Sequence, residues 1–202
     1  AAGQGKRMHS SLPKVLHSVL FRPMLHHVLD LARSLSPKTL TVVVGHGEEQ
    51  VRKSCAEYPE VRFVRQAEQK GTGHAVQQAA HLFQKESGKL LVLCGDVVLL
   101  QKKSVECLLA GKAAANVLTA VLAEPGSYGR ILRNPSGQLS AIREKVDCDS
   151  AELAICEVNS GVYAFELSAL LPALTQLGNS NQQGEYYLTD VIEILVREGK
   201  RV

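Results

Sequence analysis

The first residues of the chain combine small side chains with cations, a combination that suits a phosphate-binding loop. In "AAGQGKRMHSSLPK", the small residues Ala2, Gly3 and Gly5 would let backbone N–H groups approach phosphate oxygens. Arg7 and Lys14 could neutralise the negative charge of the phosphates. The stretch fits neither the Walker A pattern nor GxGxxG, so taken alone a turn with solvated basic residues explains it equally well.

Two later stretches place polar groups where an apolar run ends. "VRFVRQAEQKGTGHA" has Gln66 at the end of such a run and continues to Gly71 and Thr72. "KLLVLCGD" ends in Gly95 and Asp96, and a carboxylate at a strand end could hold a hard cation that bridges phosphates. Considered singly, Gln66 is more commonly a solvated residue at a strand end, and Asp96 is explained equally well as a helix cap or turn residue.

Strand-like and helix-like segments alternate along the chain and must position these groups. The expected strands are 39–45, 61–66, 89–96 and 116–123, then two runs around the turn "NPSG" and a strand at 157–166. Helical patterns lie between them, and two more are expected near 167–177 and 188–199. This order predicts an α/β fold with a doubly wound, mostly parallel mixed sheet flanked by helices. Such sheets bind ligands beyond the carboxyl ends of their strands, where Gln66 and Asp96 are expected.

The bulk composition excludes several functional classes. The chain has 202 residues, of which 45% are hydrophobic, which is enough for a substantial core. A net charge of +3 without a basic run argues against a nucleic-acid surface. Five cysteines without a CxxC pair suggest neither a disulfide framework nor a zinc site. No apolar stretch is long enough to span a membrane, so we expect a soluble, cytoplasmic protein without nucleic-acid or membrane partners.

Read together and in order, the motifs resemble one family, the N-acetylglucosamine-1-phosphate uridyltransferases. "AAGQGKRM" with "LPK" is similar to the family's LAAGxGTRM loop, and the glutamine with "GTGHA" is similar to its QxxxxGTGHA segment. "SYGRI", "IREKVD", "EVNSGVYAF" and "QGEYYLTDVI" are similar to further family segments. The chain departs from the pattern at Lys6, where the family has Thr, and at Cys94 and Val98, where it has Tyr and Pro.

The resemblance implies a Rossmann-like nucleotide-diphospho-sugar transferase fold and a magnesium-dependent reaction. UTP and N-acetylglucosamine 1-phosphate would give UDP-N-acetylglucosamine, a precursor for peptidoglycan and cell-wall synthesis, and pyrophosphate. The whole of 1–202 would be one pyrophosphorylase domain, with a nucleotide-binding half at about 1–123 and a sugar-binding half at about 124–202.

The resemblance also implies a role for individual residues. The catalytic residues would be Arg7 and Lys14, and the Mg²⁺ ligand would be Asp96. The nucleotide would be bound by Ala1, Ala2, Gly3, Lys14, Gln66, Gly71 and Thr72, and the sugar by Thr72, Gly95, Gly129, Glu144 and Asn159. In "QGEYYLTDVI", Tyr186 and Tyr187 are expected to pack, and Thr189 or Asp190 to cap the last helix.

Compared with the family, the sequence is expected to be truncated at both ends. The family's first strand would precede Ala1, and its second metal ligand, an asparagine, would follow Val202. The family's left-handed β-helix, which carries acetyltransferase activity and trimerises, would also be absent, so we expect a monomer. Three alternatives stay open: a nucleotidyltransferase for another base or sugar, a nucleotide-binding fragment without catalysis, and a protein-interaction domain.

Overall fold

The structure of the protein is a computed structural model that describes residues 2–3, 8 and 10–202. Two of the expected site residues, Ala1 and Arg7, lie outside the described residues. The chain divides into two compact units: unit 1 is Ala1–Gln69 with Leu93–Glu106, and unit 2 is Lys70–Val92 with Cys107–Val202. These units do not divide the chain near residue 123, and the functional division there stays a prediction.

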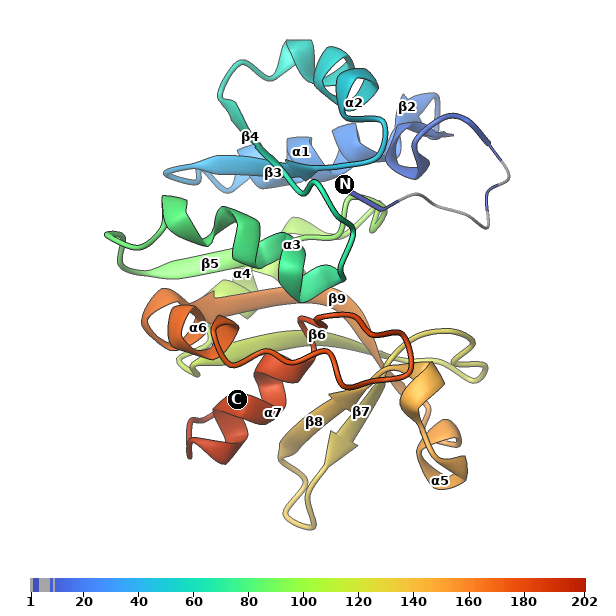
Figure 1. Cartoon of the computed structure of the whole chain (residues 1–202), viewed down its shortest axis with the longest axis vertical. Coiled ribbons are helices and arrows are strands. Elements are labelled where there is room, and N and C mark those ends of the chain that lie inside the picture. The colour runs from blue at the N-terminus through green and yellow to red at the C-terminus, as the bar shows by residue number, and fades with distance from the viewer. Residues whose placement is uncertain (1, 4–7, 9) are drawn as a thin grey trace. The chain divides into compact units, whose positions relative to one another are not determined.

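Unit 1 contains a parallel pair of strands, β3 (Leu40–Val44) and β4 (Val61–Arg65), which are labelled in Figure 1. The helix α2 (Glu48–Ser54) and a 3₁₀ turn at Cys55–Glu57 join them, as a parallel pair requires a crossover connection. Both strands end at the same edge, so the residues that follow them are brought together there. A hairpin of β1 (Ser18–Val19) and β2 (Arg22–Pro23) precedes these elements.

The helix α1 (Met24–Ser34) begins directly after Pro23, a residue that favours a helix start. It buries the apolar face that its sequence indicates, and Leu25 and Leu29 join the core of unit 1. That core consists of Val15, Leu16, Leu25, Leu29, Val42, Val44, Val51, Cys55, Tyr58 and Val61. α4 (Lys102–Ala110) begins in unit 1 and ends in unit 2.

Unit 2 is built on a five-stranded antiparallel sheet around one long strand, β9 (Glu157–Glu166). Its strand order is β5-β9-β7-β8, and β6 also pairs with β9. The other strands are β5 (Lys89–Val92), β6 (Ala115–Val121), β7 (Arg130–Arg133) and β8 (Leu139–Arg143). The helices are α3 (Thr72–Ala79), α5 (Ser150–Leu153), α6 (Leu167–Leu174) and α7 (Asp190–Arg197).

The α/β class, the mixed strand directions and the flanking helices are confirmed, but the share of parallel pairing is smaller than expected. Among the described strands, β3 with β4 is the parallel pair, and the other pairs are antiparallel. The reason is β9, which pairs antiparallel with both β5 and β6. β5 and β6 therefore run in the same direction, as the alternating pattern indicates, but they are neighbours of β9 rather than of each other.

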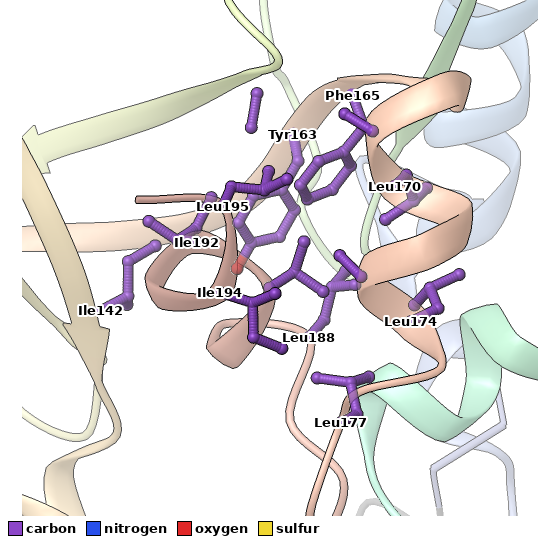
Figure 2. Close-up of a cluster of buried hydrophobic side chains, with 14 of the residues drawn as sticks. Ile142, Tyr163, Phe165, Leu170, Leu174, Leu177, Leu188, Ile192, Ile194 and Leu195 are labelled. Carbon is purple, nitrogen blue, oxygen red and sulfur yellow. The ribbon is translucent and has the colours of Figure 1, made fainter. Parts of the chain in front are cut away.

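The core of unit 2 forms where β9, α6 and α7 bring their apolar side chains together (Figure 2). Tyr163 and Phe165 of β9 stack with their ring centroids 5.5 Å apart. Leu170 and Leu174 come from α6, while Ile192 and Leu195 come from α7. This cluster fixes β9, which carries one of the expected sugar-binding residues, Asn159.

Several predicted elements are shorter in the structure. The predicted strand 89–96 stops at Val92, because Cys94–Val97 forms a turn in which the Val97 N–H donates to the Cys94 carbonyl. The predicted final helices extend over Leu167–Leu174 and Asp190–Arg197. The turn after Val92 is what places Gly95 and Asp96 in a loop of unit 1.

Candidate active site

In unit 1, Gln66 lies immediately after β4 at the carboxyl edge of the parallel pair. Its backbone N–H donates to the Val44 carbonyl over 2.7 Å, and its own carbonyl accepts from the Gln69 side chain over 3.3 Å. Gln66 is only 3% exposed, so the reading of a solvated strand-end residue is wrong. A buried amide held at a strand end is suited to reading the polar edge of a ligand.

The N-terminal loop packs against the same edge, where two glycines that the sequence analysis did not single out allow a close approach. The His46 N–H donates to the Ala2 carbonyl over 3.2 Å, which fixes Ala2 beside the end of β3. A Cβ on Gly45 would lie 3.0 Å from the Ala2 Cβ, and one on Gly47 would lie 2.3 Å from the Pro13 Cγ. Gly47 also has a φ of +68°. The signal was "GHG" directly after a buried strand, a place where backbone must approach backbone.

Lys14 and Asp96, which are expected to act on the triphosphate and on Mg²⁺, form an ion pair. The Lys14 Nζ lies 2.5 Å from the Asp96 Oδ2, and both side chains are partly exposed, at 42% and 33%. Lys14 opens a 3₁₀ turn whose next residue, Val15, is buried. A Cβ on Gly95 would lie 3.0 Å from the Val15 Cγ1, so the glycine lets the Asp96 loop pack against the Lys14 turn.

The donor set around Asp96 suits a metal that is held mainly by its substrate. Asp96 offers one carboxylate, and among the described residues there is no cluster of three or more His, Cys, Asp or Glu that could enclose an ion. Mg²⁺ commonly takes one or two protein carboxylates, several waters and the substrate's phosphates. Asp96 therefore fits such an ion, provided that a polyphosphate supplies further ligands.

In unit 2, the GTG segment runs alongside the segment that leads into α7. The Gly73 N–H donates to the Tyr186 carbonyl over 2.8 Å, and the Tyr186 N–H donates to the Lys70 carbonyl over 2.8 Å. The Thr72 Oγ1 accepts from the Leu188 N–H over 3.0 Å. A Cβ on Gly71 would lie 2.5 Å from the Tyr186 carbonyl oxygen. The two glycines therefore serve close backbone packing, which places Thr72 at the first position of α3.

Glu144 follows β8 and is held by a residue that the sequence assigned a different role. The Thr189 Oγ1 donates to the Glu144 Oε1 over 3.2 Å, and Thr189 is buried. Thr189 is the N-cap residue of α7, as expected, but its side chain makes no capping hydrogen bond to the helix. The predicted packing of Tyr186 and Tyr187 is confirmed.

The Glu144 carboxyl titrates in an unusual environment. Burial raises its pKa above the usual range for glutamate, and the hydrogen bond from Thr189 opposes this by a smaller amount. The charges of Asp190, Asp147 and Glu185 raise the pKa further. Among its charged neighbours, Asp190 itself has a pKa raised to about 6, mainly by burial. Glu144 is thus a polar group that can accept from, or in its neutral form donate to, a ligand hydroxyl.

Gly129, Glu144 and Asn159 converge where β7, β8 and β9 meet. The Asn159 N–H donates to the Gly129 carbonyl over 2.9 Å. A Cβ on Gly129 would lie 3.5 Å from the Glu144 Oε2, so the glycine leaves space beside that carboxylate. The structure therefore brings together three residues that the resemblance implies for sugar binding, although they lie in three separate motifs.

The expected residues are thus distributed between two local sites. Unit 1 holds Ala2, Gly3, Lys14, Gln66, Gly95 and Asp96, and unit 2 holds Gly71, Thr72, Gly129, Glu144 and Asn159. Gly3 is exposed, and a Cβ on it would have no neighbour within 4 Å among the described residues. In the part of the chain that the structure describes, no helix is long and apolar enough to cross a membrane.

Comparisons with known proteins identify the family of the chain. The family model of the MobA-like NTP transferase domain matches residues 1–190. The bifunctional protein GlmU of Bacillus cereus (strain AH187) is 49% identical over 98% of this chain, and so is that of Bacillus thuringiensis (strain Al Hakam). The chain spans 44% of the length of these relatives.

Solved structures share the fold at low identity. A UDP-glucose pyrophosphorylase in complex with UDP-glucose has a TM-score of 0.77 and 17% identity, over 99% of this chain and 86% of that one. A Bacillus anthracis protein described as a glucose-1-phosphate thymidylyltransferase has a TM-score of 0.80 and 19% identity, over 98% of this chain and 81% of that one. Because this family model covers residues 1–190 of the 202, the chain belongs to the family of MobA-like NTP transferase domains.

Proposed function

We propose that the protein is a uridyltransferase that converts UTP and N-acetylglucosamine 1-phosphate into UDP-N-acetylglucosamine and pyrophosphate. The observation that carries this proposal is the 49% identity to GlmU proteins over 98% of the chain. The product would serve peptidoglycan synthesis in the cytoplasm, and the chain would act as a monomer.

Unit 1 would bind the triphosphate and the base. Ala1, Ala2 and Gly3 would offer backbone N–H groups to phosphate oxygens, and Gln66 would read the uracil edge through its amide. Support comes from the anchoring of Ala2 at the end of β3 and from the burial of Gln66 at the end of β4. The resemblance also implies a backbone contact from Gly71 to the base.

Arg7, Lys14 and a Mg²⁺ ion held by Asp96 would neutralise the negative charge of the phosphates. Lys14 would bind the phosphates as a point charge, Arg7 would neutralise charge that develops in the transition state, and Asp96 would hold Mg²⁺. When bound, Mg²⁺ supplies electrostatic stabilisation of the phosphate oxygens. The ion pair between Lys14 and Asp96 supports this grouping, because it shows that both charges reach the same place.

Unit 2 would bind the sugar phosphate. Glu144 and Asn159 would hydrogen-bond the sugar hydroxyl and acetamido groups, while Gly129 would leave room for the ring and offer its backbone. The resemblance also implies that Thr72 and Gly95 bind the sugar phosphate. A wrong sugar would leave these poorly exposed polar groups unpaired, which is costly and therefore selective.

In this reaction the protein mainly positions the two substrates and stabilises their negative charge. An oxygen of the sugar phosphate attacks the α-phosphorus of UTP, and the bond from that phosphorus to the oxygen bridging to the β-phosphorus breaks. Pyrophosphate leaves with the bonding electron pair. The attacking phosphate is already an anion, so no general base is needed.

Pyrophosphate release tests the proposal. The chain is incubated with Mg²⁺, UTP and N-acetylglucosamine 1-phosphate, and controls omit each substrate in turn. We expect release only when both substrates are present, and faster with UTP than with CTP, GTP or dTTP. Preference for GTP or dTTP, or for another sugar phosphate, would instead favour a related nucleotidyltransferase. Tight UTP binding without release would favour a binding fragment.

A further inference from the structure

The side chain of Asn159 forms a hydrogen bond with a tyrosine that lies in the core of unit 2. The Asn159 Nδ2 donates to the Tyr163 hydroxyl over 2.6 Å. Both residues are poorly accessible, with 9% exposed for Asn159 and 3% for Tyr163. A hydrogen bond in so buried a place is strong locally, and it restricts the rotation of the amide.

A second hydrogen bond fixes which end of the amide faces the tyrosine. The Gly161 backbone N–H donates to the Asn159 Oδ1 over 3.0 Å. A backbone N–H can only donate, so the oxygen of the amide must face Gly161 and the nitrogen must face Tyr163. The amide therefore keeps one N–H and one oxygen lone pair for a ligand, in a fixed orientation.

The backbone here is shaped by an irregularity in β9. Leu118 of β6 pairs with Val162, but the next residue, Thr119, pairs with Asn159, so Ser160 and Gly161 are extra residues in β9. Gly161 has a φ of +76°, and the Ser160 Oγ donates to the Leu118 carbonyl over 2.6 Å. Bulges of this kind re-aim side chains beside functional sites.

Tyr163 lies where β9 returns to regular pairing. Its partners are Val92 in β5 and Val117 in β6, so its backbone is fixed on both sides. Its ring stacks on Phe165 within the core cluster shown in Figure 2. The hydroxyl is thus a rigid reference point from which the amide of Asn159 is oriented.

We propose that Tyr163 is a positioning residue for the sugar phosphate and acts through the amide of Asn159. This inference rests on the proposed function, because it takes the Asn159 amide to bind the sugar. Tyr163 itself touches neither substrate. Its hydroxyl sets the direction of the remaining Asn159 N–H. A ligand acceptor can then bind this N–H without the entropic cost of ordering the Asn159 side chain.

Tyr163→Phe tests the proposal, because it removes the hydroxyl and keeps the ring in the core. We expect the KM for N-acetylglucosamine 1-phosphate to rise about threefold to tenfold, the range of one hydrogen bond. The kcat and the KM for UTP should change by less than about twofold, since a positioning effect on ground-state binding leaves the chemical step intact. A general structural defect would instead alter both KM values.

A matched control is Tyr58→Phe in unit 1. Tyr58 is also buried, and its hydroxyl donates to the Asp30 Oδ1 over 2.9 Å, but it lies outside the proposed site. We expect this variant to keep both KM values. If it raises the sugar KM as much as Tyr163→Phe does, the effect is one of core stability and the proposal is wrong.

The double variant Asn159→Ala with Tyr163→Phe shows whether the hydroxyl acts through the amide. In an Asn159→Ala background, Tyr163→Phe should add less than about twofold to the sugar KM, because the group it orients is gone. Thermal unfolding of each variant checks that it is folded. An undiminished effect in the Asn159→Ala background would overturn the proposal.

A binding measurement separates this inference from the proposed function. If the wild type releases no pyrophosphate, calorimetric titration with UDP-N-acetylglucosamine replaces the kinetics. Tyr163→Phe should then raise the Kd for this ligand about threefold to tenfold. An unchanged Kd for a ligand that binds the wild type overturns the proposal, and so does a wild type that binds no such ligand. If turnover prefers another sugar phosphate, the proposed substrate is wrong while a raised KM for that sugar supports the role of Tyr163.

Discussion

At the scale of single residues, Asp96 allows metal binding to be separated from folding. In the part of the chain that the structure describes, Asp96 forms a partly exposed ion pair with Lys14, and exposed pairs contribute about 0 to 1 kcal/mol to stability. We expect Asp96→Asn to lower magnesium-dependent kcat about a hundredfold to a thousandfold, as typically follows the loss of one preorganised electrostatic group. Pyrophosphate release against Mg²⁺ concentration measures the effect, and thermal unfolding measures stability.

Glu106→Gln is the control for Asp96→Asn. Glu106 is also a carboxylate of unit 1, it is exposed, and it pairs with Lys102 one turn away in α4. We expect near-normal turnover in this variant. Near-normal turnover in Asp96→Asn as well would remove the metal assignment, because an essential ligand could not be replaced without loss.

At the scale of elements, the start of α3 depends on glycine. Gly71 has φ +110° and ψ 174°, a region almost closed to other residues, and a Cβ would also meet the Tyr186 carbonyl oxygen at 2.5 Å. We expect Gly71→Ala to lower the free energy of unfolding by about 2 to 4 kcal/mol through strain and overlap together. Urea denaturation provides the measurement.

Gly88→Ala isolates the overlap at Gly71. Gly88 has a similar φ of +104°, but a Cβ there would have no neighbour within 4 Å among the described residues. We expect this control to lose only the strain contribution, about 1 to 2 kcal/mol. Equal losses in the two variants would mean that Tyr186 moves away freely, and that the tight packing of this segment is unimportant.

The first turn of α7 should make stability depend on pH. The pKa of Asp190 is raised to about 6, first by burial and then by Glu193, while Arg143 opposes the rise. Between the unfolded pKa near 3.9 and the folded value, the native state binds more protons than the unfolded state, so stability falls as the pH rises.

Asp190→Asn should remove this pH dependence. Relative to wild type, we expect the variant to gain about 1 to 2 kcal/mol at pH 7.5 and nothing at pH 3.5, after allowing for partial solvent screening. Urea denaturation across this pH range checks the difference. Asp149→Asn is the control, since Asp149 caps the exposed helix α5 and asparagine is also a good cap. A gain that does not vary with pH would contradict the assignment.

At the scale of the whole molecule, the division into two units has a consequence for folding. The longest ladder joins β6, which ends at Val121, to β9, which begins at Glu157. A cut near residue 123 would therefore separate paired strands and expose their backbone groups. The division near residue 123 into a nucleotide-binding and a sugar-binding half stays a functional prediction, and it does not follow the strand pairing.

Nucleotide binding should stabilise the folded chain as a whole. At a hundred times the Kd, a ligand that binds only the native state adds about 2.7 kcal/mol, which raises the Tm of a chain of this size by roughly 5 to 10 °C. We expect this rise for UTP with Mg²⁺, measured by calorimetry, and a smaller one for ATP with Mg²⁺ at the same concentration. Equal shifts would contradict base recognition by Gln66.

The sequence alone determined the elements and the list of candidate residues. Apolar periodicity is a local property, so α1 with its buried face, β3, β4 and β9 could all be predicted. The motifs also identified the polar residues around which the site is described. Boundaries were less accurate where a turn overrode an apolar run, as after Val92.

Only the tertiary structure decided what supports those residues. Thr189 donates to Glu144 across 45 positions, and Leu188 donates to Thr72 across 116, and no local pattern encodes such pairs. The antiparallel insertion of β9 and the bulge that ties Asn159 to Tyr163 also depend on strand pairing. The physical reason is that a hydrogen bond depends on distance in space, whereas periodicity reports only which face of an element is buried.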